Sequence, residues 1–175
     1  MIFKTVLLAF LTSVIGFMPT STVETEWKTL KENNYTINYP SDWELNQSGT
    51  MGMSFILLSP LSSEEDSFRE NVNLLIQDLA GYNLDLDSYS ELSTNQIKTM
   101  VTEGKLIVNE RLMKNGQEFQ KVIYSGKQGV YNLKFEQYYW VVNGNAYVLT
   151  LTCEIDQFDA FSEMGEKILN SFKLN

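Results

Sequence analysis

The stretch that decides the fold reads SFRENVNLLIQDL, residues Ser67–Leu79, where a polar, acidic lead-in turns into an aliphatic run. Side chains of a strand alternate between its two faces. The run therefore predicts a strand with one aliphatic and one mixed face. The aliphatic face would carry Val72, Leu74 and Ile76, and the mixed face Asn73, Leu75 and Gln77. We expect the mixed face to be partly covered.

Two asparagines at the head of this run, Asn71 and Asn73, admit a chemical or an architectural explanation. Their amides could form part of a site, or they could fix the end of a strand in a particular fold. We predict the second. Since buried amides need partners, we expect both to hydrogen-bond backbone groups of neighbouring segments where the loop enters the sheet. Phe68 is expected to pack where the lead-in folds back.

Working outward, runs of β-branched and aromatic residues between turn signals predict further strands. They cover residues 27–30, 35–39, 53–58, 106–113, 118–125, 131–142 and 146–154. Asn115–Gly116 and 143–145 (Asn-Gly-Asn) join the last four as two hairpins, because Asn-Gly favours tight hairpin turns. Residues 62–70 predict a short helix. The loop 81–87 is the most loop-like interior segment.

Two longer helices are predicted from apolar residues at helical spacing. The first begins at a cap, Asp87 or Ser88, and runs to about residue 103, before Gly104. Its apolar stripe would contain Tyr89, Leu92, Gln96 or Ile97, Met100 and Val101. The second begins near Asp156 or Asp159 and ends at Phe172. Its stripe would contain Phe158, Phe161, Met164 or Gly165, Ile168 and Phe172.

This order of elements is strands, a helix, a four-stranded antiparallel meander and a closing helix. It predicts an α+β fold in which helices flank a central antiparallel sheet. With 175 residues, 43% of them hydrophobic, the chain has the length of one domain plus a targeting segment. We expect a single domain over residues 23–175.

Composition excludes several classes of function. The 13 basic and 22 acidic side chains give a net charge of −9 without any basic block, which disfavours nucleic acid as a partner. The chain has no histidine, the commonest general base and transition-metal ligand. Its single cysteine, Cys153, excludes an intrachain disulfide, and it falls on an aliphatic strand face as a small core residue rather than a nucleophile.

Residues 1–22 are predicted to be a signal peptide. Lys4 precedes an apolar stretch, residues 5–18, that is shorter than the roughly 20 residues of a membrane anchor. An uncleaved anchor and a buried core helix remain the alternatives. Export to the periplasm or outside the cell is therefore the expected localisation, or tethering to the membrane if the segment is not cleaved.

Two motifs resemble a known family. Residues 35–43, YTINYPSDW, resemble the Y-x-I-x-Y-P-x-x-W opening of the PsbP-like family, and FRENVN, residues 68–73, resembles its F-x-E/D-N-V/I-N segment. The meander and closing helix follow in the same order, so the resemblance spans residues 27–175. The motif positions expected to be structural are Tyr39, Pro40, Trp43, Phe68, Glu70, Asn71 and Asn73.

The resemblance implies an α/β/α sandwich of PsbP-like type, also used by a Ran-binding protein family and by small exported bacterial proteins. Members of this family are generally not enzymes, and the photosynthetic ones bind photosystem II. Metal sites proposed for those members rely partly on histidine, which this chain lacks. The exported bacterial branch therefore fits better, with no catalytic residue, no cofactor and no metal.

Candidate sites remain in two places. The acidic residues Asp78, Asp85, Asp87 and Glu91 could hold Ca²⁺, but their spacing fails the EF-hand pattern and suits a solvated loop and helix start. The aromatics Tyr82, Tyr89, Tyr138 and Trp140 are candidate interface residues, unless a helix covers them. We claim no metal site.

The sequence thus favours an exported, non-catalytic PsbP-like domain that binds a protein partner or the cell envelope. The alternative is a carrier of a small ligand or Ca²⁺ that uses the loop 81–87. A hydrolase based on the pair Asp85 and Asp87 is the least favoured hypothesis, because two carboxylates would do all the proton transfer.

Overall fold

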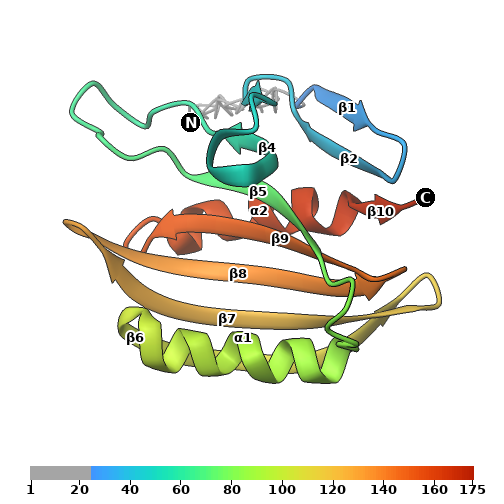
Figure 1. Cartoon of the computed structure of the whole chain (residues 1–175). Helices are drawn as coiled ribbons and strands as arrows, with labels where there is room; N and C mark the ends of the chain where they lie inside the picture. The colour runs from blue at the N-terminus through green and yellow to red at the C-terminus, as the bar shows by residue number, and fades with distance from the viewer. Residues whose placement is uncertain (1–24) are drawn as a thin grey trace, which may run out of the picture.

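The computed structural model describes residues 25–175, so the predicted signal segment, residues 1–22, lies outside the described residues. Figure 1 shows the arrangement of strands and helices in this part of the chain. In order, the elements are β1 (Trp27–Lys31), β2 (Tyr35–Pro40), β3 (Glu44–Asn46), the 3₁₀ turn η1 (Thr50–Gly52), β4 (Met53–Leu58), β5 (Asn71–Asp78), α1 (Leu86–Met100), β6 (Thr102–Lys114), β7 (Gln117–Gln128), β8 (Tyr131–Val142), β9 (Asn145–Glu154), α2 (Phe158–Ser171) and β10 (Lys173–Leu174).

Seven strands form one antiparallel sheet in the order β3-β4-β5-β9-β8-β7-β6. The last four in sequence, β6 to β9, are the predicted meander. Asn115 and Gly116 have φ of 52° and 77°, and Asn143 and Gly144 have φ of 51° and 72°. Positive φ at both central residues is the geometry that selects Asn-Gly in a hairpin. The predicted α+β class and both hairpins are therefore confirmed.

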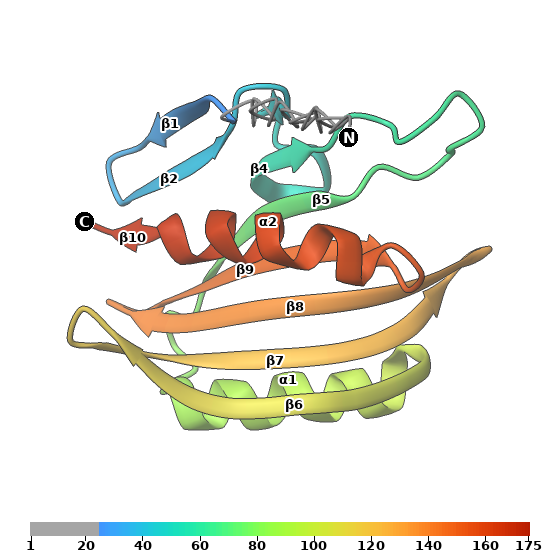
Figure 2. The same cartoon turned by 180° about the vertical axis from the view of Figure 1, so that it is seen from behind.

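One face of the sheet packs against α2 and holds the larger hydrophobic core. Val72 and Leu74 of β5 and Leu149 of β9 are fully buried there, against Ile168 of α2. The opposite face carries the smaller core, in which Ile97 of α1 packs with residues of β7, β8 and β9. Figures 1 and 2, which are opposite views, show α1 and α2 on opposite sides of the sheet.

A second sheet, in the order β1-β2-β10, closes the outer side of α2. The ring of Tyr35 on β2 stacks on Phe172 at the end of α2, with ring centroids 5.6 Å apart. The backbone N–H of Asn38 donates to Ser171 Oγ at 2.8 Å, so the end of α2 satisfies a strand donor. The sequence did not predict β3 or β10, whose three and two residues are too short for a periodic signal.

The predicted short helix over residues 62–70 is wrong, because this segment is irregular. Asp66 Oδ2 accepts hydrogen bonds from the backbone N–H and the hydroxyl of Ser62, at 3.0 and 2.7 Å. Such side-chain bonds compete with helical ones. Arg69 then ties the segment to β4 by donating to the carbonyls of Leu58 and Ser59.

The predicted bounds of α1 also need correction. Asp85 is its N-cap, accepting from the N–H of Ser88 at 2.9 Å, and the helix ends at Met100, well before residue 103. Gly104 lies inside β6 and does not end the helix. A Cβ there would approach the carbonyl oxygen of Ile97 to 2.4 Å, so the glycine lets β6 pass close to the last turn of α1.

The predicted apolar stripe of α1 is correct only in part. Tyr89, Ile97 and Val101 pack in the smaller core, whereas Leu92 and Met100 are exposed. The other side chains that α1 buries are the small polar Ser90 and Thr94. The stripe predicted for α2 is correct, with Phe158, Ile168 and Phe172 in the larger core.

Candidate binding groove

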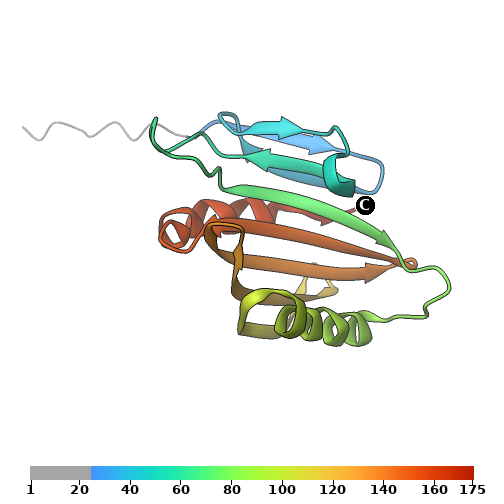
Figure 3. The same cartoon turned by 60° about the vertical axis from the view of Figure 1, so that its left-hand side comes forward.

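Helix α1 leaves part of its side of the sheet uncovered. It lies over β6, β7 and β8, and its side chains reach β5 and β9 at one end, where Tyr89 bonds Gln77 and Ile97 packs in one cluster with Val148. Figure 3 shows α1 at one end of the sheet, with β4 and β5 toward the other. The uncovered part holds residues of β5 and β9 that do not face α2, among them Asn73 and Thr150. This surface is the mixed strand face predicted from the sequence.

A cavity of about 720 Å³ occupies this uncovered surface, and we call it the groove. Its polar lining residues are Asn71, Asn73, Gln128, Gln137, Thr150 and Thr152. Its aliphatic and aromatic lining residues are Met51, Met53, Ile56, Leu58, Phe68, Tyr124, Val130, Tyr131, Leu133 and Phe135, with Gly129 between β7 and β8. None of these lining residues carries a charge at neutral pH.

Strand register places the polar residues of the floor side by side. Asn73 of β5 lies opposite Thr150 of β9, which in turn lies opposite Gln137 of β8. Asn71 lies opposite Thr152 in the next row of the same face. The floor of the groove is thus a patch of neutral amides and hydroxyls that crosses three strands.

Hydrogen bonds hold this patch in place. Gln137 Nε2 donates to Thr150 Oγ1 at 3.0 Å and Gln137 Oε1 accepts from the hydroxyl of Tyr139. Asn73 Nδ2 donates to Asn71 Oδ1 at 3.1 Å, and Asn71 Nδ2 donates to the carbonyl oxygen of Arg69 at 3.2 Å. These bonds orient the side chains before a ligand arrives.

The rim of the groove exposes apolar side chains to water. Met51 is 78% exposed and Val130 is 82% exposed. Met51 has φ of 55°, a left-handed backbone conformation that is costly for residues other than Gly. Such conformations recur at functional sites. Phe68 packs on Tyr131 with ring centroids 5.1 Å apart, and both rings line the groove.

The one ionisable side chain in the lining that shows a shifted pKa is a tyrosine. Burial raises the pKa of Tyr124 to about 12, and its ring stacks on Phe135 with centroids 4.6 Å apart. The phenol therefore stays neutral across the physiological range. A smaller cavity of about 340 Å³ beneath the edge of α1 shares Tyr124 and Gln137 with the groove, so the groove continues toward the helix.

The two asparagines of the opening stretch line this groove, and their hydrogen bonds differ from the predicted bonds to backbone groups of neighbouring segments. Asn71 bonds a backbone group of its own segment two residues earlier, and Asn73 bonds Asn71 instead of a backbone group. The reason is the strand's alternation, which turns both amides to the uncovered face. Phe68 also lines the groove.

The remaining motif residues serve the core. Tyr39, Pro40 and Trp43 are buried beside α2. Glu70 is 1% exposed on the face opposite the groove, and its Oε1 has no hydrogen-bond partner among residues 25–175. Burial raises the pKa of the Glu70 carboxyl, and nearby backbone hydrogen bonds offset this only in part.

The four aromatic residues predicted as an interface do not form one exposed surface. Tyr138 and Trp140 are 4% and 5% exposed, because they face α2 and pack on Phe119. They are core residues, as in the alternative of a covered face. Tyr89 is half-buried against Tyr139, and Tyr82 is 72% exposed in the loop before α1. An interface role for Tyr82 and Tyr89 stays a prediction.

Among the described residues, three of the four acidic side chains, all except that of Glu91, have a partner nearby. Asp78 accepts from the N–H of Ala80, Asp85 caps α1, and Asp87 pairs with Arg111 of β6. Within residues 25–175, no three or more Cys, Asp or Glu side chains gather as a potential metal site. Cys153 is fully buried, and burial raises the pKa of its thiol.

Sequence reasoning missed most of the groove, although one signal was present. Thr150 and Thr152 interrupt the aliphatic β9, and Gln137 interrupts the aromatic β8, each on the face away from α2. Polar residues at period two in buried strands indicate that one face lacks apolar cover. The contributions of η1 and of the β7–β8 turn depend on tertiary contacts and had no such signal.

Comparisons with known proteins agree with this architecture. No family model and no curated protein matches the chain. Among solved structures, the cyanobacterial PsbP of Synechocystis sp. PCC 6803 is similar, with a TM-score of 0.62 and 14% identity over 92% of this chain and 99% of that one.

Two further solved structures share the arrangement. One is LpqN of Mycobacterium tuberculosis, with a TM-score of 0.61 and 11% identity over 90% of this chain and 99% of that one. The other is PA94 of Pseudomonas aeruginosa, with a TM-score of 0.60 and 11% identity over 83% and 94% of the respective chains. At such low identities the likeness concerns the fold, and the chain adopts the PsbP-like α+β fold.

Proposed function

We propose that the chain is an exported accessory module, without catalytic activity of its own, that binds a protein partner or another envelope component in the groove. The observation that carries this proposal is the uncharged cavity of about 720 Å³ on the part of the sheet that α1 leaves open. Its exposed apolar rim favours burial by a partner, because apolar surface removed from water stabilises a complex.

The chemistry of the groove supports binding rather than catalysis. General acid–base catalysis needs a group that titrates near the working pH. The lining contains amides, hydroxyls and two tyrosines, and burial raises the pKa of one of them, Tyr124, to about 12. Cys153 points to the other face of the sheet, into the core. The groove therefore offers hydrogen bonds and apolar contact, and its lining contains no carboxylate, thiol, amine or imidazole.

Two observations support export and an envelope role. The apolar N-terminal segment has the composition of a signal peptide, and LpqN is described as a protein involved in cell envelope biogenesis. Neither helix within residues 25–175 has the length and hydropathy needed to cross a bilayer. The helices on opposite sides of the sheet also support an α/β/α sandwich, of which the uncovered part of one face is a local gap.

Site-specific photocross-linking of the full chain in cells tests this proposal. A photoreactive residue replaces Val130 at the rim of the groove, and the matched control replaces Met113, which is 67% exposed on β6 away from the groove. We expect a discrete adduct from position 130, absent from position 113 and lost when Gln137→Ala is added. Equal labelling from both positions, or none from position 130, would contradict the proposal.

If the protein is instead a carrier of a small ligand, the groove is a better candidate site than the loop 81–87. The acidic residues of the loop 81–87 already have local partners, whereas the groove volume lies within the roughly 300–1,000 Å³ of small-molecule sites. Denaturing mass spectrometry of purified protein, compared with the Gln137→Ala variant, would reveal a co-purified neutral molecule under this alternative.

A further inference from the structure

We propose that the groove binds a partner through an extended, uncharged peptide segment that lies along β5 over Asn71 and Asn73. This inference rests on the proposed function and specifies the chemistry of the partner. It follows from the type, spacing and free hydrogen-bonding capacity of the floor side chains, and from the absence of charge in the lining.

The floor side chains match the peptide group in chemistry. A carboxamide carries a carbonyl oxygen and an NH₂ group, so it can accept from a backbone N–H and donate to a backbone C=O at the same time. Asn71, Asn73 and Gln137 place three such groups in the groove. Unlike a charged side chain, each of them can bond a peptide group without requiring a charged counterpart.

The spacing of the asparagines matches an extended chain. Asn71 and Asn73 are two residues apart on one face of β5. A strand rises about 3.4 Å per residue, so the Cα atoms of these two residues are roughly 7 Å apart along the strand. An extended segment has the same two-residue repeat, and its peptide groups that point to one side recur at the same interval. The two amides bond each other at 3.1 Å between Asn73 Nδ2 and Asn71 Oδ1, and successive peptide groups can meet the amide atoms that this bond leaves free.

Both amides retain capacity for such bonds. Their hydrogen bonds within residues 25–175 use one N–H of each amide and Oδ1 of Asn71. Asn73 Oδ1 and one N–H of each side chain remain for a ligand. The hydrogen bonds from Asn73 to Asn71 and from Asn71 to Arg69 already hold both side chains in one rotamer. Binding a segment therefore costs less conformational entropy than binding it to mobile side chains.

The walls determine which side chains the segment can carry. Ile56 and Leu58 of β4 flank the asparagines on one side, opposite Asn73 and Asn71 in the strand register. Met51 and Val130 stand exposed at the rim. A charged side chain in this lining would lose water without gaining a partner, which is costly. The bound segment is therefore uncharged and carries aliphatic or small polar side chains.

Selection from a displayed library of random nonapeptides tests the inference, with the predicted domain, residues 23–175, as the target. We expect binders without charged residues over their central positions. In each binder, N-methylation of single backbone positions removes one N–H at a time. We expect N-methylation to lower the affinity about tenfold at alternate positions and to change it little at the positions between them. One hydrogen bond contributes up to about that factor to the affinity.

Variants connect this pattern to the floor. Asn73→Leu should lower the affinity for the selected peptides about tenfold. The control Asn132→Leu, at an exposed strand position outside the groove, should leave this affinity unchanged. If Asn73→Leu does not fold, Asn73→Ser replaces it, because it also removes the amide and keeps a small polar side chain. Thermal unfolding of each variant separates lost binding from lost structure.

The outcomes separate the two proposals. Binders whose N-methyl scan lacks a period of two, or that tolerate Asn73→Ser, would overturn the peptide inference. So would a groove that binds only the neutral detergent decyl maltoside. In both cases an adduct from position 130 would still support binding in the groove. If that adduct is missing as well, the proposed function also falls.

Discussion

Lys121 Nζ lies 2.9 Å from Glu136 Oε1, at ion-pair distance but outside the angles of a hydrogen bond, on the face of the sheet that α2 covers. The side chain of Glu136 is 1% exposed and that of Lys121 is 15% exposed. Glu166 of α2 lies 3.4 Å from the same Nζ. A single ammonium group thus neutralises a buried carboxylate and also contacts the helix.

Lys121→Met should destabilise the protein by about 3–5 kcal/mol, because it leaves the Glu136 carboxylate buried without a partner. Urea unfolding at pH 7 measures the loss. The control Lys167→Met removes an exposed pair with Glu163, 2.8 Å long, and should change the free energy of unfolding by less than about 0.5 kcal/mol. The double variant Lys121→Met/Glu136→Leu should recover most of the loss, and equal losses in the single and double variants would contradict the account.

Glu70 should make the protein less stable as the pH rises. Burial raises the pKa of its carboxyl above the ordinary value of 4.5. The folded state then binds more protons than the unfolded state between 4.5 and the raised pKa, so the free energy of unfolding falls as the pH increases through that interval. Glu70→Gln should therefore raise the melting temperature at pH 7, with a gain that disappears below pH 4.5.

Asp66→Asn provides the control of opposite sign for Glu70. The hydrogen bond from the Ser62 hydroxyl, with others from backbone N–H groups, lowers the pKa of Asp66. Its stabilisation is present above the ordinary pKa of 3.8 and is lost as the pH falls. Asp66→Asn should lower the melting temperature at pH 7, with a difference that shrinks in acid. If the change in melting temperature followed the same pH trend in both variants, burial would not be raising the pKa of Glu70.

Gly104→Ala should destabilise the contact between α1 and β6. A Cβ at this position would lie 2.4 Å from the carbonyl oxygen of Ile97 and 2.9 Å from that of Val101. Both are backbone atoms, so the end of α1 or the start of β6 has to move, at a cost of about 1–3 kcal/mol. Urea unfolding measures the cost, and hydrogen exchange should show faster opening of the last turn of α1. Lys105→Ala, at the exposed neighbouring position, is the matched control and should be nearly neutral.

The sequence predicted the larger part of the fold because its signals are local. Asn-Gly turns fix both hairpins, and alternation in β5 assigns Val72 and Asn73 to opposite faces. The irregular segment 62–70 was missed because Asp66 bonds back to Ser62 in place of helical bonds, and because the contacts of Arg69 with the end of β4 form only in the folded chain. Predicting the groove requires knowing that α1 covers only part of one face of the sheet, which depends on the tertiary position of the helix.

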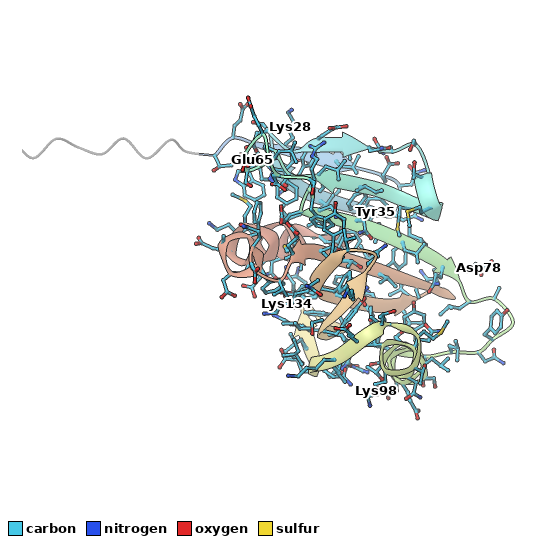
Figure 4. All side chains as sticks on the ribbon, turned by 90° about the vertical axis from the view of Figure 1, so that its left-hand side faces the viewer. Lys28, Tyr35, Glu65, Asp78, Lys98 and Lys134 are labelled. Carbon is cyan, nitrogen blue, oxygen red and sulfur yellow. The ribbon has the colours of Figure 1, made fainter. Side chains whose placement is uncertain are left out.

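Figure 4 shows the side chains on the helices and strands, and residue type alone does not tell which of them are buried. Tryptophan is common in interfaces, and only the packing of α2 shows that Trp140 belongs to the core. Its ring lies 5.3 Å from that of Phe119 and 5.1 Å from that of Phe172, between centroids. Aromatic residues are enriched both in cores and in interfaces, so residue type alone does not separate the two.

Trp140→Ala should therefore act on stability rather than directly on binding. Removing a buried aromatic ring costs about 3–5 kcal/mol, and Trp140→Phe should lose less because part of the stacking remains. Tyr82→Ala, at a position 72% exposed, should change the free energy of unfolding by no more than about 0.5 kcal/mol. Urea midpoints of the three variants measure the difference. A Trp140→Ala protein with an unchanged midpoint would place this ring at a surface and contradict the core assignment.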